Sequence, residues 1–264
     1  MPSRPRSEFV YQVFALLIAF ILVHALYVAL VRPQAEVDLQ AAAAALQAEP
    51  EREPPRSFYV VLKDYEQEAC LVLALWALAI LGYKALAGLR QQRLLERDLL
   101  QLPETLPVGA EDTRELVGRL AALPHDEREA LPARALLTAV ERFAATRNVQ
   151  DVSTATRDLC QAEGERLESE LSIIRYIAWA IPSVGFIGTV RGIGDALGQA
   201  HRAVAGDITG VTASLGVAFN STFIALVISI VLMFFVHQLQ LLQERLVLDS
   251  ERYVDHRLIR RLRG

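Results

Sequence analysis

Four long apolar segments, separated by charged segments, dominate the pattern of hydrophobic and polar positions along the chain. They are residues 9–31, 70–89, 173–197 and 211–239. Each is about as long as the roughly 20 residues that cross a bilayer as a helix. Only helices and closed barrels satisfy backbone groups in lipid, and these segments are far too long for barrel strands. The pattern therefore predicts an all-α, multi-pass membrane protein with four transmembrane helices.

The composition agrees with this pattern, because 53% of the residues are hydrophobic and the mean hydropathy is +0.27. The first apolar segment follows two arginines, as the apolar part of a signal peptide does. The sequence at its end, Val31-Arg32-Pro33, lacks the small residues of a cleavage site. We interpret the segment as a retained anchor.

The positive charges near the segment ends predict the orientation in a bacterial inner membrane. Arginines flank the N-terminus (1–8), the region 90–172 and the tail 240–264, whereas the loop 32–69 is acidic. We therefore expect both termini and the region 90–172 in the cytoplasm, and the loops 32–69 and 198–210 outside. His201 and Arg202 in the second external loop count against this orientation.

The charged regions are predicted to be largely helical. Apolar residues recur at helical spacing in the cytoplasmic region and in the tail, which favours amphipathic helices that pack on their neighbours. A helix over 151–171, with Ser153 as a cap near its start, is expected to lead directly into the third span. In the first external loop an alanine run favours helix. Prolines end two of these helices, at Pro50, Pro54 and Pro55 in the loop and at Pro103 and Pro107 after the second span.

The chemistry-bearing residues exclude several classes of function. No phosphate-binding loop, zinc-protease motif, nucleophile elbow or dinucleotide fingerprint is present, so no enzyme, cofactor, metal or nucleic-acid partner is predicted. The two cysteines, Cys70 and Cys160, are expected on opposite sides of the membrane, where they would not form a disulfide.

Small residues gather on one face of each of the last two spans. At about 100° per residue these faces hold, in order, Gly185, Gly188, Thr189, Gly192 and Ala196, and then Ser214, Ala218, Ser221, Ala225 and Ser229. Small faces let membrane helices approach closely, since lipid provides no hydrophobic drive for their association. The sequence therefore predicts tight packing between these helices.

Polar atoms accompany the small faces. Thr189 and Thr222 each lie roughly 12–17 Å from the external helix end at 1.5 Å rise per residue, which is near mid-membrane. Ser221 and Asn220 add polar groups beside Thr222. Such a group of side chains is predicted to line a narrow polar path for ions. Towards the external end of the third span, Arg191 and Asp195 are four residues apart, and we expect an ion pair at the external mouth, because unpaired charges in a membrane are costly.

The run Pro182-Ser183-Val184-Gly185-Phe186-Ile187-Gly188-Thr189-Val190-Arg191-Gly192 resembles a signature helix of the MotA/TolQ/ExbB proton-channel family, and residues 213–226 are similar to the family's last helix. Together these two helices cover about a quarter of the chain. The four-span plan is closer to that of MotA than to those of TolQ and ExbB. Arg191 departs from the family pattern, since many members carry an aromatic or apolar residue there.

The resemblance implies roles for residues and partners. Thr189 and Thr222 would be pore threonines, and Pro182 would mark a kink. The chain would form a homo-oligomer, a pentamer, around helices of a single-span partner of the MotB/ExbD/TolR kind. That partner would supply an intramembrane aspartate, which this sequence lacks deep in any span.

Two functions follow. The first is a stator-type ion-channel subunit that couples proton- or sodium-motive force to mechanical work or energy transduction; in it, the small faces of the last two spans line a central passage and spans one and two face lipid. The second is a non-conducting membrane scaffold, for which helix packing alone suffices.

Overall fold

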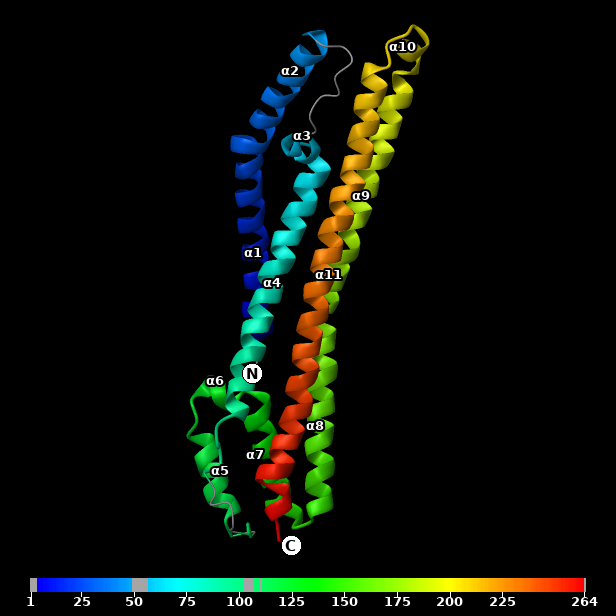
Figure 1. The fold of residues 1–264 in the computed structure, drawn as a ribbon. Coiled ribbons are helices and arrows are strands. Elements are labelled where there is room, and N and C mark those ends of the chain that lie inside the picture. Colours follow the sequence, from blue (N-terminus) through cyan, green and yellow to red (C-terminus); the bar gives the residue numbers. More distant parts are fainter. Residues whose placement is uncertain (1–3, 49–56, 102–106, 110, 264) are drawn as a thin grey trace. The chain divides into compact units, whose positions relative to one another are not determined.

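The regular structure of the chain is helical. The computed structural model describes residues 4–48, 57–101, 107–109 and 111–263, and no strand occurs within these residues (Figure 1). The chain divides into two compact units, Met1–Leu81 with Ile173–Val236 and Gly82–Ser172 with His237–Gly264. The all-α prediction is confirmed.

Four helical stretches are long and apolar enough to cross a membrane. Within the described residues they are Phe9–Ala45, Tyr65–Leu95, Val149–Gly198 and Thr209–Arg261. Each contains one of the predicted apolar segments and extends beyond it. The prediction of four helices able to span a membrane is therefore confirmed, and the bounds of the spans stay predictions.

The first unit begins with three helical segments that follow one another without a loop. They are α1 (Arg4–Leu26), the π-helix η1 (Tyr27–Val31) and α2 (Arg32–Ala48). The first part of the predicted external loop is thus helix, and the alanine run lies within α2. Pro50, Pro54 and Pro55, the predicted end of that helix, lie outside the described residues.

The rest of the first unit contains α3 (Phe58–Leu62), the start of α4 (Tyr65–Leu95), α9 (Ser172–Gly198), α10 (Ala200–Val204) and the start of α11 (Thr209–Arg257). Side chains join α4 to α1: the Trp76 indole donates to the Gln12 carbonyl at 2.9 Å, and the Tyr11 hydroxyl donates to the Ala79 carbonyl at 3.1 Å. In the same unit, α9 and α11 run side by side (Figure 1).

The second unit has a hydrophobic core. Besides the ends of α4 and α11, it contains α5 (Thr113–Ala121), α6 (His125–Arg128), α7 (Leu131–Thr146), α8 (Val149–Glu170) and the short η2 (Ile259–Arg261). Fully buried residues of this core include Leu116, Leu136, Phe143, Val152, Val254 and Leu258. The C-terminal tail therefore packs on its neighbours through its apolar stripe, as an amphipathic helix does.

Helix ends in the second unit differ from those expected at two places. The helix before the third span starts at Val149 rather than at 151, because the Asn148 side chain accepts from the Gln150 N–H at 2.9 Å and caps it. Ser153, the expected cap, lies inside α8. After the second span, α4 ends at Leu95, ahead of the prolines predicted to stop it; of these, Pro103 lies outside the described residues.

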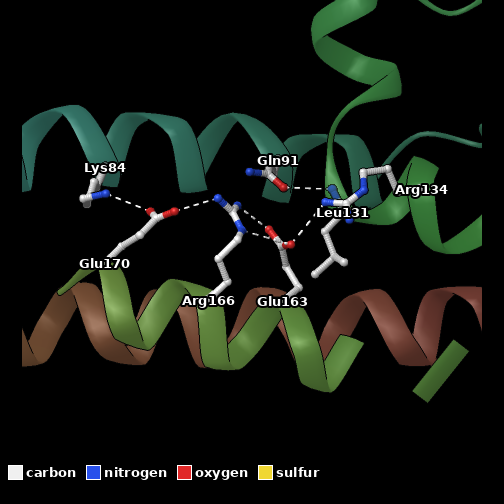
Figure 2. A network of polar contacts seen from close by, with 7 residues as sticks. All are labelled: Lys84, Gln91, Leu131, Arg134, Glu163, Arg166 and Glu170. Carbon is white, nitrogen blue, oxygen red and sulfur yellow. Dashed lines mark hydrogen bonds and ion pairs between the residues drawn. The ribbon is translucent and has the colours of Figure 1, made fainter. Parts of the chain in front are cut away.

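A chain of ion pairs joins α4, α7 and α8 in the second unit (Figure 2). The Lys84 ammonium contacts Glu170 at 2.8 Å, Arg166 contacts Glu170 at 2.6 Å, and Arg166 and Arg134 both donate to Glu163, at 2.5 and 3.1 Å. Nearby, the Gln91 side chain accepts from the Leu131 N–H at 3.0 Å, so a side chain of α4 satisfies the N-terminus of α7.

Glu163 is the buried centre of this chain, since only 7% of its side chain is exposed. Burial by itself raises the pKa of a carboxyl group. Here the hydrogen bonds and charges of Arg166 and Arg134 outweigh burial and hold the pKa of Glu163 below its usual value. Glu163 is therefore ionised at neutral pH, which is the state that its two arginines stabilise.

Candidate functional site

Three glycines of α9 bring its backbone against the small residues of α11. A Cβ placed on Gly192 would lie 2.7 Å from the Ser214 carbonyl oxygen and 2.8 Å from the Ala218 Cβ. A Cβ on Gly188 would lie 2.5 Å from the Ser221 Cβ, and one on Gly185 would overlap the Ala225 Cβ. Real side chains do not approach so closely, so the spacing of the two helices depends on these glycines.

The small faces are consequently buried against each other within one chain. Gly185, Gly188 and Gly192 are buried on α9, as are Ala218 and Ser221 on α11. The central passage that these faces were expected to line in an oligomer stays a prediction, and within one chain each face covers the other. The outward faces carry larger apolar side chains, such as those of Phe186, Ile187, Phe219 and Phe223.

Pro182 lies inside α9, where it removes one backbone hydrogen bond. A proline has no N–H, so the carbonyl four residues earlier, that of Ala178, loses its helical donor. The Ser229 hydroxyl of α11 donates to this carbonyl at 3.0 Å. The kink assigned to Pro182 stays a prediction, whereas the compensation by Ser229 is a feature that the sequence did not reveal.

Thr189 and Thr222 meet at the interface between α9 and α11. Their hydroxyl oxygens are in hydrogen-bonding contact. Each also has a backbone acceptor on the opposite helix: Thr189 reaches the Ala218 carbonyl at 3.0 Å, and Thr222 reaches the Gly185 carbonyl at 3.3 Å. Both side chains are half-buried. The structure therefore brings together the two threonines that the resemblance singled out, and it gives them reciprocal contacts.

Ser221 and Asn220 have different surroundings from the threonines. The Ser221 hydroxyl is buried and donates to the Val217 carbonyl of its own helix at 2.8 Å. Asn220 is half-buried beside a cavity of about 720 Å³, whose lining also includes Asp38, Ser57 and Phe223. Ser221 is thus engaged in helix packing, and open space adjoins Asn220 rather than Ser221.

Arg191 has a partner other than the one expected. Its Nε and Nη2 atoms donate to the two carboxylate oxygens of Glu66 at 2.7 and 2.8 Å. No ion pair between Arg191 and Asp195 occurs among the described residues. Glu66 is in the first turn of α4. From the sequence we assigned Glu66 to the acidic external loop 32–69. Its position about one turn before the second apolar segment was the only sign that it could lie near the ends of the spans.

A second group of charges lies near the same end of α4. The Glu68 carboxylate accepts from the His24 ring at 2.7 Å and is also paired with Arg32. The Arg32 guanidinium lies over the Tyr65 ring, 4.4 Å from its centre. These contacts tie α4 to α1 and α2 on both sides of the π-helix. His24, a polar residue in the first apolar segment, is satisfied in this way.

The site offers hydroxyls and one ion pair rather than a catalytic or metal-binding set. Throughout the described ranges, no group of three or more His, Cys, Asp or Glu side chains is placed to hold a metal ion. Hydroxyl pairs replace part of the hydration shell of a small cation or order water. The hydroxyl pair is therefore suited to contact with an ion or with water.

One comparison with known proteins gave a match, and the match includes Thr189 and Thr222. The model of the MotA/TolQ/ExbB proton channel family matches residues 127–252, from α6 to near the end of α11, and so includes both motifs. Comparisons with curated proteins and with solved structures gave no match. The family model agrees with the resemblance seen in the two motifs, and residues 127–252 of this chain belong to the MotA/TolQ/ExbB proton channel family.

Proposed function

We propose that the chain is a stator-type ion-channel subunit of an inner-membrane complex that couples proton- or sodium-motive force to mechanical work or energy transduction. The observation that carries the proposal is the contact between the Thr189 and Thr222 hydroxyls. This contact lies in the region that matches a proton-channel family. Both side chains are half-buried, so an ion or water chain that passes along the helix pair has access to them.

The threonines alone do not carry an ion, because a hydroxyl neither titrates near neutral pH nor holds a full charge. A carboxylate of another protein completes the pathway in this proposal. The partner is a single-span protein of the MotB/ExbD/TolR kind with an intramembrane aspartate. Five copies of the chain surround its helices, with both termini of each copy in the cytoplasm.

A non-conducting scaffold is the second candidate, and one observation favours it. Each threonine hydroxyl has a backbone carbonyl within reach on the opposite helix, so the two hydroxyls also serve as packing contacts. In a scaffold this packing is their whole role.

The double substitution Thr189→Val/Thr222→Val separates the two candidates. Valine keeps the shape of threonine and removes the hydroxyl, so packing is conserved while the polar chemistry is lost. The tagged chain is purified from its native membrane, the co-purified single-span partner is identified by mass spectrometry, and ion flux is measured in vesicles that contain both. We expect normal assembly and loss of flux.

Thr212→Val is the matched control. Thr212 is an exposed threonine of α11 whose hydroxyl contacts the Ile208 carbonyl at 3.2 Å and the Thr209 carbonyl at 2.9 Å. This variant is expected to conduct like the wild type. Wild-type flux in the double variant, at normal membrane levels, would reject the channel and leave the scaffold.

A further inference from the structure

Arg191 poses an electrostatic difficulty for a cation pathway. It follows Thr189 by two residues, which is about 3 Å along the helix axis. A fixed arginine charge beside a narrow pathway repels cations. The proposed function therefore requires that something offset this charge.

Glu66 is placed to offset it. The carboxylate faces the guanidinium edge-on and makes two parallel hydrogen bonds, of 2.7 and 2.8 Å. This bidentate geometry is the strongest form of an arginine–carboxylate pair. Only 12% of the Glu66 side chain is exposed, against 43% for Arg191, so the carboxylate is held against the protein rather than in solvent.

The stem of Glu66 lies against α9 as well. A Cβ placed on Gly188 would lie 3.1 Å from the Glu66 Cγ. Gly188 is also the residue against which Ser221 of α11 packs. Glu66 thus contacts α9 at Gly188 with its stem and at Arg191 with its carboxylate. These two contacts lie on either side of Thr189 along the helix axis, so Glu66 lies at the level of the threonine pair.

We propose that Glu66 neutralises Arg191 beside the Thr189–Thr222 pair and thereby keeps this part of the chain compatible with the passage of a cation. The inference rests on the proposed channel function. It assigns to α4 a residue of the ion pathway, in addition to those of α9 and α11. It also explains how the chain tolerates an arginine within the signature helix.

The proposal predicts an effect that depends on the sign of the charge. Glu66→Gln keeps the length of the side chain and its contact with Gly188, but it removes the carboxylate that is paired with Arg191 and leaves only the weaker influence of Asp64 and Asp195 on that charge. We expect cation flux to fall roughly tenfold or more, because the positive charge of Arg191 would then repel cations in the nearby pathway. Glu66→Gln/Arg191→Gln removes both charges, and we expect it to restore flux to near the wild-type rate.

The rescue distinguishes neutralisation from a tethering role. If the pair acted only as a tether between α4 and α9, the double variant would be as impaired as Glu66→Gln. Flux is measured in vesicles that contain the chain and its co-purified partner, with membrane level and oligomer size determined for each variant. Glu36→Gln is the matched control, because it makes the same substitution at an exposed carboxylate of α2, and it is expected to leave flux unchanged.

Two results separate a failure of this inference from a failure of the proposed function. Wild-type flux that persists in Glu66→Gln, or a double variant as impaired as Glu66→Gln, overturns the role of Glu66 and leaves the channel intact. Absence of flux from the wild-type chain with its partner overturns the channel, and the inference with it.

Discussion

Individual glycines of α9 differ in what surrounds them, although the sequence presents them alike. Gly192 is buried, and a Cβ there would lie 2.7 Å from a backbone oxygen of α11. Gly194, two residues further on, has nothing within 4 Å of an added Cβ. Backbone cannot move aside as a flexible side chain can, so the first position requires glycine and the second does not.

Gly192→Ala and Gly194→Ala therefore form a matched pair. Alanine at 192 forces the two helices apart, and overpacking of this kind costs about 1–3 kcal/mol. At 194 the same change has free space, and it adds up to about 1 kcal/mol of helix propensity. Thermal unfolding of the purified protein in detergent should show a lower midpoint for the first variant only. Equal midpoints would contradict the close approach at Gly192.

The pair formed by Pro182 and Ser229 allows a double-mutant test. Ser229→Ala leaves the Ala178 carbonyl without a donor, which costs about 1–3 kcal/mol for a buried acceptor. In a Pro182→Ala background the alanine N–H restores the helical bond to that carbonyl. The cost of Ser229→Ala, measured by denaturation, should then fall below about 1 kcal/mol. Ser183→Ala is the control, because Ser183 bonds within its own helix, to the Trp179 carbonyl at 3.3 Å. An equal cost in both backgrounds would show that Ser229 has no such role.

At the scale of elements, ion pairs hold the helices of the second unit together. Glu163 of α8 receives arginines from α7 and from its own helix, and Glu170 joins α8 to Lys84 of α4 (Figure 2). Lys84 is itself buried, with 6% of its side chain exposed. Breaking a buried pair leaves a charge without compensation, so each link depends on its partner.

Glu163→Gln is expected to destabilise the second unit by about 1.5–3 kcal/mol, because hydrogen bonds to a charged group are lost. Asp158→Asn, an exposed carboxylate on the same helix, is the control and should change little. Hydrogen exchange of α7 and α8 reports on this unit specifically. Unchanged protection in Glu163→Gln would argue against a central role for this residue.

The same group predicts a pH dependence. The pKa of Glu163 is lower in the folded protein than its usual value of 4.5, because Arg166 and Arg134 outweigh the effect of burial. Its contribution to stability is therefore complete above pH 4.5 and is lost as the pH falls through the lower folded pKa. In Glu163→Gln this part of the acid destabilisation should be absent. Identical acid profiles of wild type and variant, by circular dichroism, would be inconsistent with the ionised pair.

At the scale of the whole molecule, the orientation in the membrane stays a prediction from the charge distribution. A fluorescent protein fused after Gly264 should be bright, since it folds in the cytoplasm, and alkaline phosphatase inserted after Gly206 should be active, since it folds outside. Gly206 lies in the turn between α10 and α11 with a φ of +96°, so an insertion there disturbs no helix. A dark fluorescent fusion at Gly264, or an inactive phosphatase at Gly206, would contradict the predicted orientation.

The four span-length apolar segments, the small faces of α9 and α11 and the family of residues 127–252 were predictable from the sequence alone. These features are local, because the length of an apolar run and the size of residues at helical spacing do not depend on the rest of the chain. The helical tail at residues 240–264 is of the same kind. The errors in the second unit concern helix boundaries: the start of α8, which the Asn148 side chain caps, and the end of α4 at Leu95.

Which side chains meet across helices was not predictable in this way, because it depends on the tertiary structure. Arg191 and Asp195 are neighbours on a helix by spacing, yet Arg191 binds Glu66, which is 125 residues away in the sequence. The Ser229 hydroxyl finds the carbonyl that Pro182 leaves free, 51 residues away. The small faces of α9 and α11 cover each other within one chain. Sequence spacing describes neighbours within one helix, whereas contacts between helices depend on how their faces rotate and pack, and that is settled only when the whole bundle forms.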